Sequence, residues 1–162
     1  MSVPDLLRGC PLFFELYDRE IAKIVNHCTV VTVQDGDKVF EDGAEGSEIY
    51  IVLTGRAKVV KQMGSHQIEV QTLLPGDIFG EMVILDEPHR NSDVVAVGET
   101  CILEIRYEDF FVVFKKEPKI FGLMVLNLAR MIARRLSSSN DVIIKLQSFM
   151  TGAKDDAERE IA

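Results

Sequence analysis

The chain has 162 residues, 47% of them hydrophobic, which suits one ordinary globular domain with a real core. Its formal net charge of -8 argues against non-specific binding to nucleic acid or to an anionic membrane surface. The first residues lack the basic and apolar regions of a signal peptide, and no apolar run approaches the ~18 residues of a membrane span, so we expect a cytoplasmic protein with neither nucleic acid nor membrane among its partners.

The first segment, residues 6–27, has the apolar periodicity of helices. Pro11 is expected to separate a short first helix from a second one, because proline interrupts the helical hydrogen-bond pattern. Asp18 is the expected N-cap of the second helix, since its side chain can accept a hydrogen bond from a free backbone N–H.

Residues 29–106 change to short β-branched runs that are separated by turn sequences such as Pro75-Gly76-Asp77. The predicted strands are Thr29–Val33, Lys38–Phe40, Ile49–Leu53, Lys58–Lys61, Ile68–Leu73, Val94–Val97 and Cys101–Ile105. Many short strands at regular spacing indicate a sandwich or a barrel. No helices alternate with the strands, which argues against a dinucleotide-binding sheet.

From Tyr107 onward the helical period returns. A short helix is predicted to end before Pro118, a residue that suits the first position of the next helix. That next helix is predicted from about residue 119 to 149, with one apolar stripe over some eight turns. The stripe consists of Phe121, Val125, Leu128, Ile132, Leu136, Ser139, Ile143, Leu146 and Met150.

Gly152 is the expected breaker at the end of this helix, and the residues around it are polar. We therefore expect three parts: a first domain over residues 1–118, a long helix over 119–150 and a frayed polar tail over 151–162.

The titratable residues show no catalytic or metal-binding constellation. The cysteines and histidines lie in separate segments without the spacing of a metal site, and we expect reduced thiols, no metal and no cofactor. The residues in question are Cys10, Cys28, Cys101, His27, His66 and His89. The sequence therefore predicts that the protein is not an enzyme.

The segment around Gly80, Glu81 and Arg90 has residue types that suit a sugar joined to a phosphate. A glycine lets the backbone approach a ligand, a glutamate accepts a hydrogen bond from a ribose hydroxyl, and a guanidinium holds phosphate oxygens. Asn91 and Ser92 offer further donors. On spacing alone, an ion pair between Glu81 and Arg90 that closes a surface loop is an equal alternative.

Three motifs in order resemble the cyclic nucleotide-binding domain family over about residues 6–150. Phe79–Ala96 is similar to the family's phosphate-binding cassette, and Val39–Gly55 to its first signature. Cys10–Leu16 resembles its usual entry helix. The resemblance implies an α+β fold: a β-roll (double-stranded β-helix, jelly-roll-like) with N-terminal helices and a long C-terminal helix.

The resemblance also implies a role for each residue of the cassette. Gly80 and Glu81 would hold the ribose 2′-hydroxyl of the nucleotide. Arg90 would hold the exocyclic phosphate oxygen. The residues that would assist it through side chain or backbone amide are Asn91, Ser92, Met82 and Val83.

In dimeric bacterial members related to the catabolite activator protein, the long helix pairs across a two-fold axis and two polar residues on it contact the base. The sequence Ala133-Arg134-Arg135-Leu136 matches that helix, and counting onward places Ser139 and Asn140 at the base-contacting positions. These polar residues could instead mark a bend in the helix or fix its register.

The chain departs from the family pattern at several positions. Val83 replaces a smaller residue near the phosphate, and Pro88 comes one residue early, so that His89 precedes the arginine. Asp93 would oppose a phosphate if its carboxylate faced the pocket and would be harmless if it faced outward. Asn91 stands where some relatives carry the threonine that favours guanine, which leaves the choice of nucleotide open.

Our leading hypothesis is a stand-alone sensor that binds cyclic AMP, or alternatively cyclic GMP, forms a homodimer through the long helix and signals to an unknown partner protein. The DNA-binding helix-turn-helix of the activator relatives is not seen in this sequence. Two alternatives stay open: a protein-interaction module that lost its ligand, and a sensor of a cyclic dinucleotide.

Overall fold

The computed structural model describes residues 3–85 and 89–160. The chain forms two compact units, residues 1–127 and residues 128–162. The predicted division at residue 118 stays a prediction.

The N-terminal helices of the first unit are α1 (Val3–Leu7), the 3-10 turn η1 (Pro11–Phe13) and α2 (Asp18–Val25). The expectation that Asp18 caps α2 is wrong, because the helix already begins at this residue and Tyr17 is the cap. The Glu20 carboxylate accepts a hydrogen bond from the Tyr17 backbone N–H at 2.8 Å, which satisfies a free donor at the helix start. Asp18 instead pairs with Arg8 at 2.7 Å.

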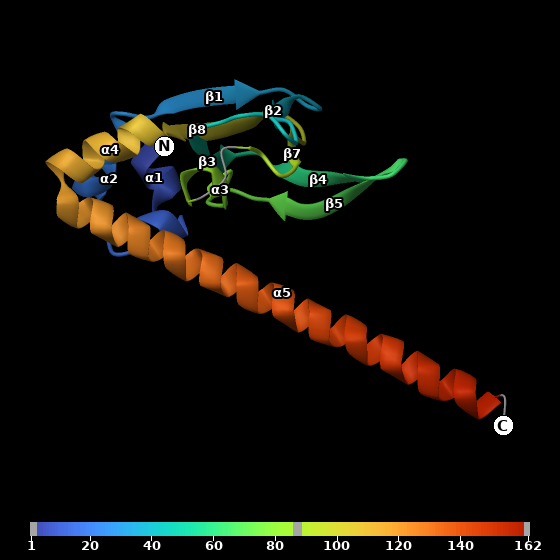
Figure 1. Ribbon diagram of the computed structural model, residues 1–162. Helices are drawn as coiled ribbons and strands as arrows, with labels where there is room; N and C mark the ends of the chain where they lie inside the picture. Colours follow the sequence, from blue (N-terminus) through green and yellow to red (C-terminus); the bar gives the residue numbers. More distant parts are fainter. Residues whose placement is uncertain (1–2, 86–88, 161–162) are drawn as a thin grey trace. The chain divides into compact units, whose positions relative to one another are not determined.

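Two antiparallel four-stranded sheets follow, in the orders β1-β8-β3-β6 and β2-β7-β4-β5. The strands are β1 (Thr29–Val33), β2 (Lys38–Phe40), β3 (Glu48–Thr54), β4 (Ala57–Met63), β5 (His66–Leu73), β6 (Ile78–Phe79), β7 (Asp93–Ala96) and β8 (Thr100–Arg106). Figure 1 shows β4 and β5 extending as a hairpin beyond the other strands. This arrangement confirms the expected α+β fold with a β-roll.

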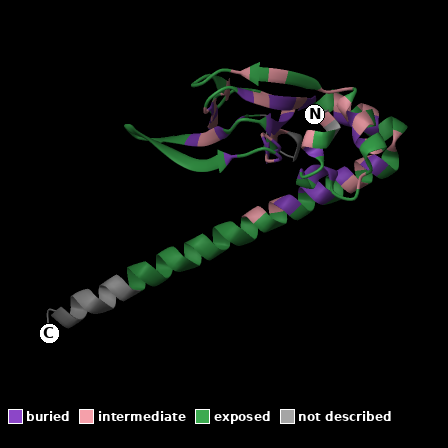
Figure 2. Cartoon of the chain, turned by 180° about the vertical axis from the view of Figure 1, so that it is seen from behind, coloured by how far each residue is buried: buried purple, intermediate pink, exposed green. Residues whose placement is uncertain are grey.

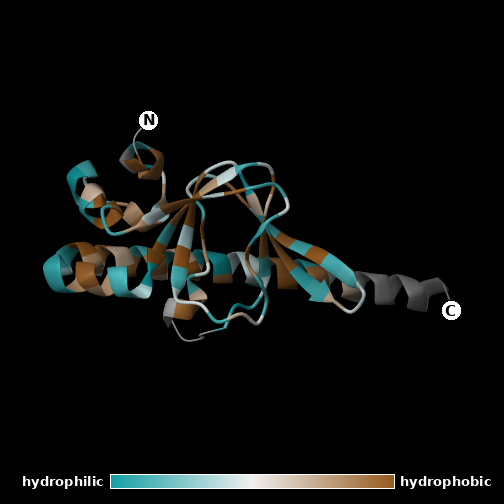
Figure 3. Ribbon diagram, turned by 90° about the horizontal axis from the view of Figure 1, so that it is seen from above, coloured by the Kyte–Doolittle hydropathy of each residue, from teal (hydrophilic) through white to brown (hydrophobic). Residues whose placement is uncertain are grey.

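The core of the roll lies between the two sheets. Tyr50, Ala57, Phe79 and Val94, from β3, β4, β6 and β7, pack in one buried cluster. Figure 3 shows hydrophobic segments, in brown, on the strands of the roll. Their burial is the main source of stability for the roll.

Strand β6 is short and was not predicted as a strand, but it positions the candidate site. It pairs with β3, so that Phe79 lies opposite Tyr50 and Ile78 opposite Ile51. Gly80 follows immediately with a φ of +75°, a conformation that favours glycine. The chain then forms a short helical turn, α3 (Met82–Leu85).

The helices that follow the roll are α4 (Tyr107–Lys116) and α5 (Pro118–Glu160), which confirms Pro118 as the first residue of the long helix. In the first unit the beginning of α5 is fixed to η1. The buried Asn127 amide donates to the carbonyls of Leu12 at 3.2 Å and Phe14 at 2.7 Å. Figure 1 shows α1, α2 and α4 gathered at the same end of the roll.

The second unit is the rest of α5. Its residues from 137 to 151 are all exposed, as the green part of the helix in Figure 2 shows. Gly152 does not end the helix as expected, since the helical backbone continues to Glu160. The residues after Gly152 include alanine, lysine, glutamate and arginine, all strong helix formers. Within the described residues, no helix is both long and apolar enough to cross a membrane.

Candidate functional site

Backbone hydrogen bonds bring the loop before β3 against the arginine of the cassette. The Arg90 N–H donates to the Ala44 carbonyl at 2.8 Å, and the Gly43 N–H donates to the Arg90 carbonyl at 2.7 Å. Glu45 and His89 form an isolated β-bridge beside them. Residues 43–48 therefore lie next to residues 89 and 90, although they are far apart in sequence.

The Arg90 side chain is almost fully buried and is held by three acceptors. Its Nη1 donates to the carbonyls of Glu48 at 2.9 Å and Gly80 at 3.0 Å, and its Nη2 lies 2.9 Å from Glu48 Oε2. The side chain of Arg90 is 2% exposed and that of Glu48 26% exposed. The ion pair found here is with Glu48, a residue that the sequence did not indicate.

Aromatic rings form the floor beneath this guanidinium. The Arg90 Cζ lies 4.3 Å from the ring centroid of Phe40 and 5.5 Å from that of Tyr50. The ring faces attract the cation and limit its movement. Burial also raises the pKa of the Tyr50 hydroxyl to about 12, so this group stays neutral at physiological pH.

One donor of the arginine has no protein acceptor. The buried Nε of Arg90 makes no hydrogen bond within the described part of the chain. Most buried polar groups in native proteins are satisfied, and leaving one unsatisfied costs about 1–3 kcal/mol. An anion that reached this donor would remove that cost.

Two glycines leave room for the guanidinium. A Cβ at Gly46 would lie 2.4 Å from Arg90 Nη2 and 2.5 Å from Nε. A Cβ at Gly80 would lie 2.7 Å from Nη1, and the positive φ there adds backbone strain. Both positions thus require glycine if Arg90 is to keep its place.

The predicted residues beside Gly80 occupy the turn between β6 and α3. Glu81 is buried, whereas Met82 is exposed and Val83 is half-buried. Gly80, whose carbonyl contacts Arg90, and Glu81 directly follow the strand that pairs with β3.

The residues after Arg90 lead into β7. Ser92 is buried and its hydroxyl donates to Asn91 Oδ1 at 3.3 Å. The Asn91 carbonyl accepts a hydrogen bond from the Lys61 ammonium. Both predicted residues are therefore next to the arginine, and the Asn91 side chain is exposed.

The departures from the family pattern can be located, except Pro88, which lies outside the described residues. The Asp93 carboxylate accepts a hydrogen bond from the Asp42 N–H at 2.7 Å and pairs with Lys38 at 2.9 Å. These contacts, the hydrogen bond above all, hold the pKa of Asp93 below its ordinary value. His89 is exposed, with its Nε2 4.0 Å from the Glu45 carboxylate.

The predicted base contacts belong to the second unit. Ser139 and Asn140 are both exposed there, and the Ser139 hydroxyl donates to the Arg135 carbonyl one turn earlier at 3.0 Å. Within the first unit, Gly80 contacts Arg90 through its carbonyl. The base-contacting role of Ser139 and Asn140 stays a prediction.

Three neighbours of the arginine, Glu48, Phe40 and Tyr50, were not predicted as site residues. Phe40 and Tyr50 were included only as parts of predicted strands. The available signal was the Gly46-Ser47-Glu48 segment at the start of β3, which combines a small residue with a carboxylate. Their contact with Arg90 depends on strand pairing across the roll.

A family model, the cyclic nucleotide-binding domain, matches residues 30–117, which is more than half of the chain. The chain belongs to the cyclic nucleotide-binding domain family. This family is a regulatory binding domain rather than a catalytic one.

Among curated proteins, the cyclic AMP receptor protein of Thermus thermophilus is 31% identical over 88% of this chain, which spans 64% of that protein's length. Glutaminase 2 of Bradyrhizobium diazoefficiens is 30% identical over 85% of this chain, but the match covers only 22% of the glutaminase. The region shared with that enzyme is therefore a small part of it.

Solved structures include chains with a similar fold. The catabolite activator protein of Thermus thermophilus has a TM-score of 0.75 and 31% identity, covering 86% of this chain and 63% of that chain. The N-terminal domain of a transcriptional regulator from Streptomyces coelicolor has a TM-score of 0.72 and 26% identity, covering 86% and 95%.

Proposed function

We propose that this protein is a sensor that binds a cyclic mononucleotide in its β-roll, with cyclic AMP as the ligand. The proposal is supported by family membership and by the 31% identity to a protein named as a cyclic AMP receptor. Cyclic GMP is the competing ligand, since a human cyclic GMP-dependent protein kinase is 28% identical over 65% of this chain.

The observation that carries the proposal is the unsatisfied Nε of Arg90, buried between Gly46 and Phe40. A phosphodiester carries a single negative charge and offers oxygens that accept from guanidinium donors. The other two nitrogens of Arg90 are already held by protein acceptors, so its orientation is set before a ligand arrives. A cyclic phosphate would supply the missing acceptor.

The remaining residues of the cassette take complementary roles in this proposal. Gly80 and Glu81 hold the ribose 2′-hydroxyl, with the glutamate accepting its proton in a hydrogen bond. The backbone amides of Met82 and Val83 face the phosphate together with Asn91 and Ser92. Since Asp93 is bonded to Asp42 and Lys38, its carboxylate is occupied by these two partners.

Titration calorimetry tests this proposal on protein that has been unfolded and refolded to remove any nucleotide. Cyclic AMP should bind, and Arg90→Lys should weaken binding about a hundredfold, because lysine keeps the charge but lacks the Nε donor and the planar fork. Arg56→Lys, which changes an exposed arginine in the turn between β3 and β4, is the matched control and should bind as the wild type does.

The choice of ligand is settled in the same experiment. Cyclic GMP should bind more weakly than cyclic AMP, and a cyclic dinucleotide should not compete. No heat with any of these ligands would overturn the sensor proposal and favour a protein-interaction module that does not bind a nucleotide.

We further propose that the protein is a homodimer through α5. Apolar side chains that are more than half exposed recur along its second unit: Leu136, Val142, Ile143, Ile144, Leu146, Phe149 and Met150. An identical helix offers the same stripe, so a two-fold dimer would bury both. In this dimer Ser139 and Asn140 contact the base, and a partner protein responds to the ligand-bound state.

A further inference from the structure

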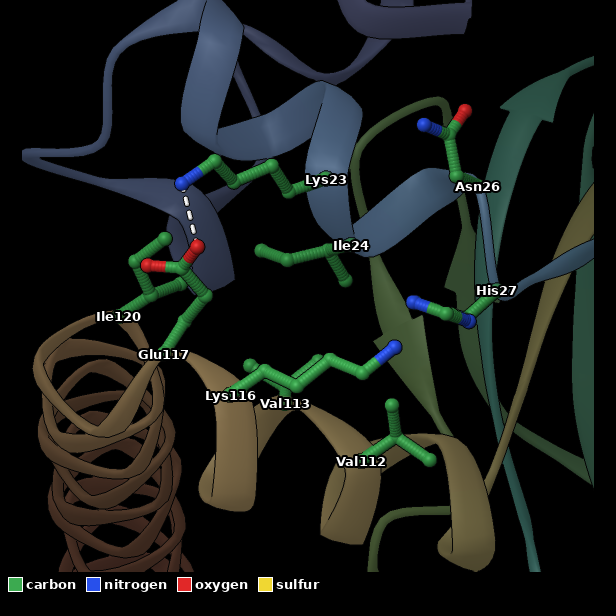
Figure 4. Close-up of a pocket in the computed structure, with 9 residues that line it drawn as sticks. All are labelled: Lys23, Ile24, Asn26, His27, Val112, Val113, Lys116, Glu117 and Ile120. Atoms are coloured by element: carbon green, nitrogen blue, oxygen red, sulfur yellow. Dashed lines mark hydrogen bonds and ion pairs between the residues drawn. The ribbon is translucent and has the colours of Figure 1, made fainter.

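A cavity of about 330 Å³ lies at one end of the first unit, between α2, α4 and the first turn of α5. Its volume is in the range of small-molecule sites. Figure 4 shows the side chains that line it: Lys23, Ile24, Asn26, His27, Val112, Val113, Lys116, Glu117 and Ile120. None of these residues belongs to the group around Arg90.

The inner wall of this cavity is apolar. Ile24, Val113 and Ile120 are at most 5% exposed, and each comes from a different helix. Val112 is half-buried and adds to the same wall. The wall therefore favours an aliphatic group, because burying each methylene removes apolar surface from water.

The mouth of the cavity is polar and mainly basic. At one side the Lys23 ammonium forms an ion pair with the Glu117 carboxylate. At the other side the Lys116 ammonium and the His27 imidazole point toward one another across the opening, as Figure 4 shows. Lys116 makes no hydrogen bond or ion pair within the described ranges, so its charge is available to a ligand.

This basic mouth contrasts with the formal net charge of -8 of the whole chain. One carboxylate in the cavity, that of Glu117, is already engaged by Lys23. A monoanion between Lys116 and His27 would meet one cation and one imidazole N–H.

We propose that this cavity binds a small monocarboxylate with an unbranched aliphatic chain. The carboxylate lies between the Lys116 ammonium and the His27 imidazole, and the chain lies against Ile24, Val112 and Ile120. This site is separate from the cyclic nucleotide site and does not depend on the function proposed for it.

The test uses octanoate as the probe and follows backbone amide signals of the full chain by NMR. Octanoate should shift the signals of residues 23–27 and 112–120, and signals of residues 80–92 should stay in place. The dissociation constant should fall about fourfold for each added methylene from butanoate through hexanoate to octanoate. The uncharged 1-octanol should bind more weakly than octanoate.

Three variants complete the test. Lys116→Gln should weaken octanoate binding about fivefold, whereas Lys119→Gln, which changes an exposed lysine nearby on α5, should leave it unchanged. Val112→Phe should fill the cavity and abolish binding. The inference is overturned if the shifted signals lie elsewhere, if affinity is independent of chain length, or if Lys116→Gln binds as the wild type does.

Discussion

Glu48 and Arg90 are joined in two ways inside the roll. The Glu48 backbone carbonyl accepts a hydrogen bond from Arg90 Nη1 at 2.9 Å, and the Glu48 carboxylate lies 2.9 Å from Nη2. The first contact does not depend on which residue occupies position 48, whereas the ion pair does. The Gly80 carbonyl also holds Nη1 at 3.0 Å, so a substitution can remove the carboxylate while two carbonyls keep the guanidinium in place.

We predict that Glu48→Gln tightens the binding of a cyclic mononucleotide about fivefold at low ionic strength. The Glu48 carboxylate repels an incoming phosphate, and glutamine removes that charge at nearly the same size. Calorimetry at low and high salt measures the effect, which should shrink as salt screens the repulsion. Glu99→Gln, an exposed position in the turn before β8, is the control. Weaker binding by Glu48→Gln would instead show that the carboxylate positions the guanidinium.

Gly46→Ala is predicted to weaken nucleotide binding at least about tenfold while the roll stays folded. The new Cβ would lie 2.4 Å from Arg90 Nη2, so the guanidinium must move away from its present acceptors. Gly46 does not have a positive φ, so alanine adds no backbone strain. Gly9→Ala, where a Cβ has no atom within 4 Å, is the matched control. Calorimetry gives the affinity and circular dichroism checks the fold; unchanged affinity would contradict the prediction.

The Asp93 carboxylate should contribute stability that depends on pH. Its pKa is lowered in the folded state, so this contribution is fully present above its ordinary value of 3.8 and is lost as pH falls through the native pKa. Asp93→Asn should therefore reduce the free energy of unfolding by about 1 kcal/mol at pH 7. Urea titrations at pH 7 and pH 3 should show the difference from wild type shrinking at the lower pH.

Asp141→Asn is the control for that experiment, because this carboxylate is exposed on α5. It should differ little from the wild type at either pH. A difference for Asp93→Asn that stayed constant from pH 7 to pH 3 would show that packing, rather than charge, is responsible.

The α5 stripe can be tested by placing a charge on it. Ile143→Glu should convert a dimer to a monomer, because a carboxylate in a helix–helix seam is buried without a partner. Lys145→Glu, an exposed position two residues away, should remain dimeric. Sedimentation velocity measures the mass in each case. A monomeric wild type, or a dimeric Ile143→Glu, would overturn the proposed interface.

The thiols of Cys10 and Cys28 should be unreactive in the folded protein. Burial raises the pKa of each to about 12, so almost none of either thiolate exists at pH 8. Reaction of these two thiols with a chromogenic disulfide should be slow at pH 8 and should become fast in urea. Rapid labelling of Cys10 without denaturant would show that the N-terminal helices open readily.

Local sequence patterns predicted most of the fold. The predicted strands at residues 29–33 and 38–40 coincide with β1 and β2, because β-branched residues and flanking turns define them. β6 was missed, since a two-residue strand has no readable alternation and exists through its pairing with β3. Gly152 was expected to end α5, but strong helix formers after it continue the helix.

The candidate site was less predictable than the fold. Gly80, Glu81 and Arg90 lie in one short stretch, so residue chemistry and the family resemblance both indicated them. Glu48 was missed because it is 42 positions from Arg90 in the sequence, and its contact depends on the closure of the roll. The direction of the Asp93 side chain likewise required the position of Lys38 on a neighbouring strand.

A long, flexible arginine normally has about 2 kcal/mol of rotamer entropy to lose when it is fixed. In this roll that loss takes place when the chain folds, because Glu48, Gly80 and the ring of Phe40 already immobilise the guanidinium. Folding therefore bears an entropic cost that ligand binding would otherwise bear, and this cost lowers the stability of the fold. A saturating concentration of ligand should raise the melting temperature, because the ligand binds the folded state. Binding should require little movement of the Arg90 guanidinium.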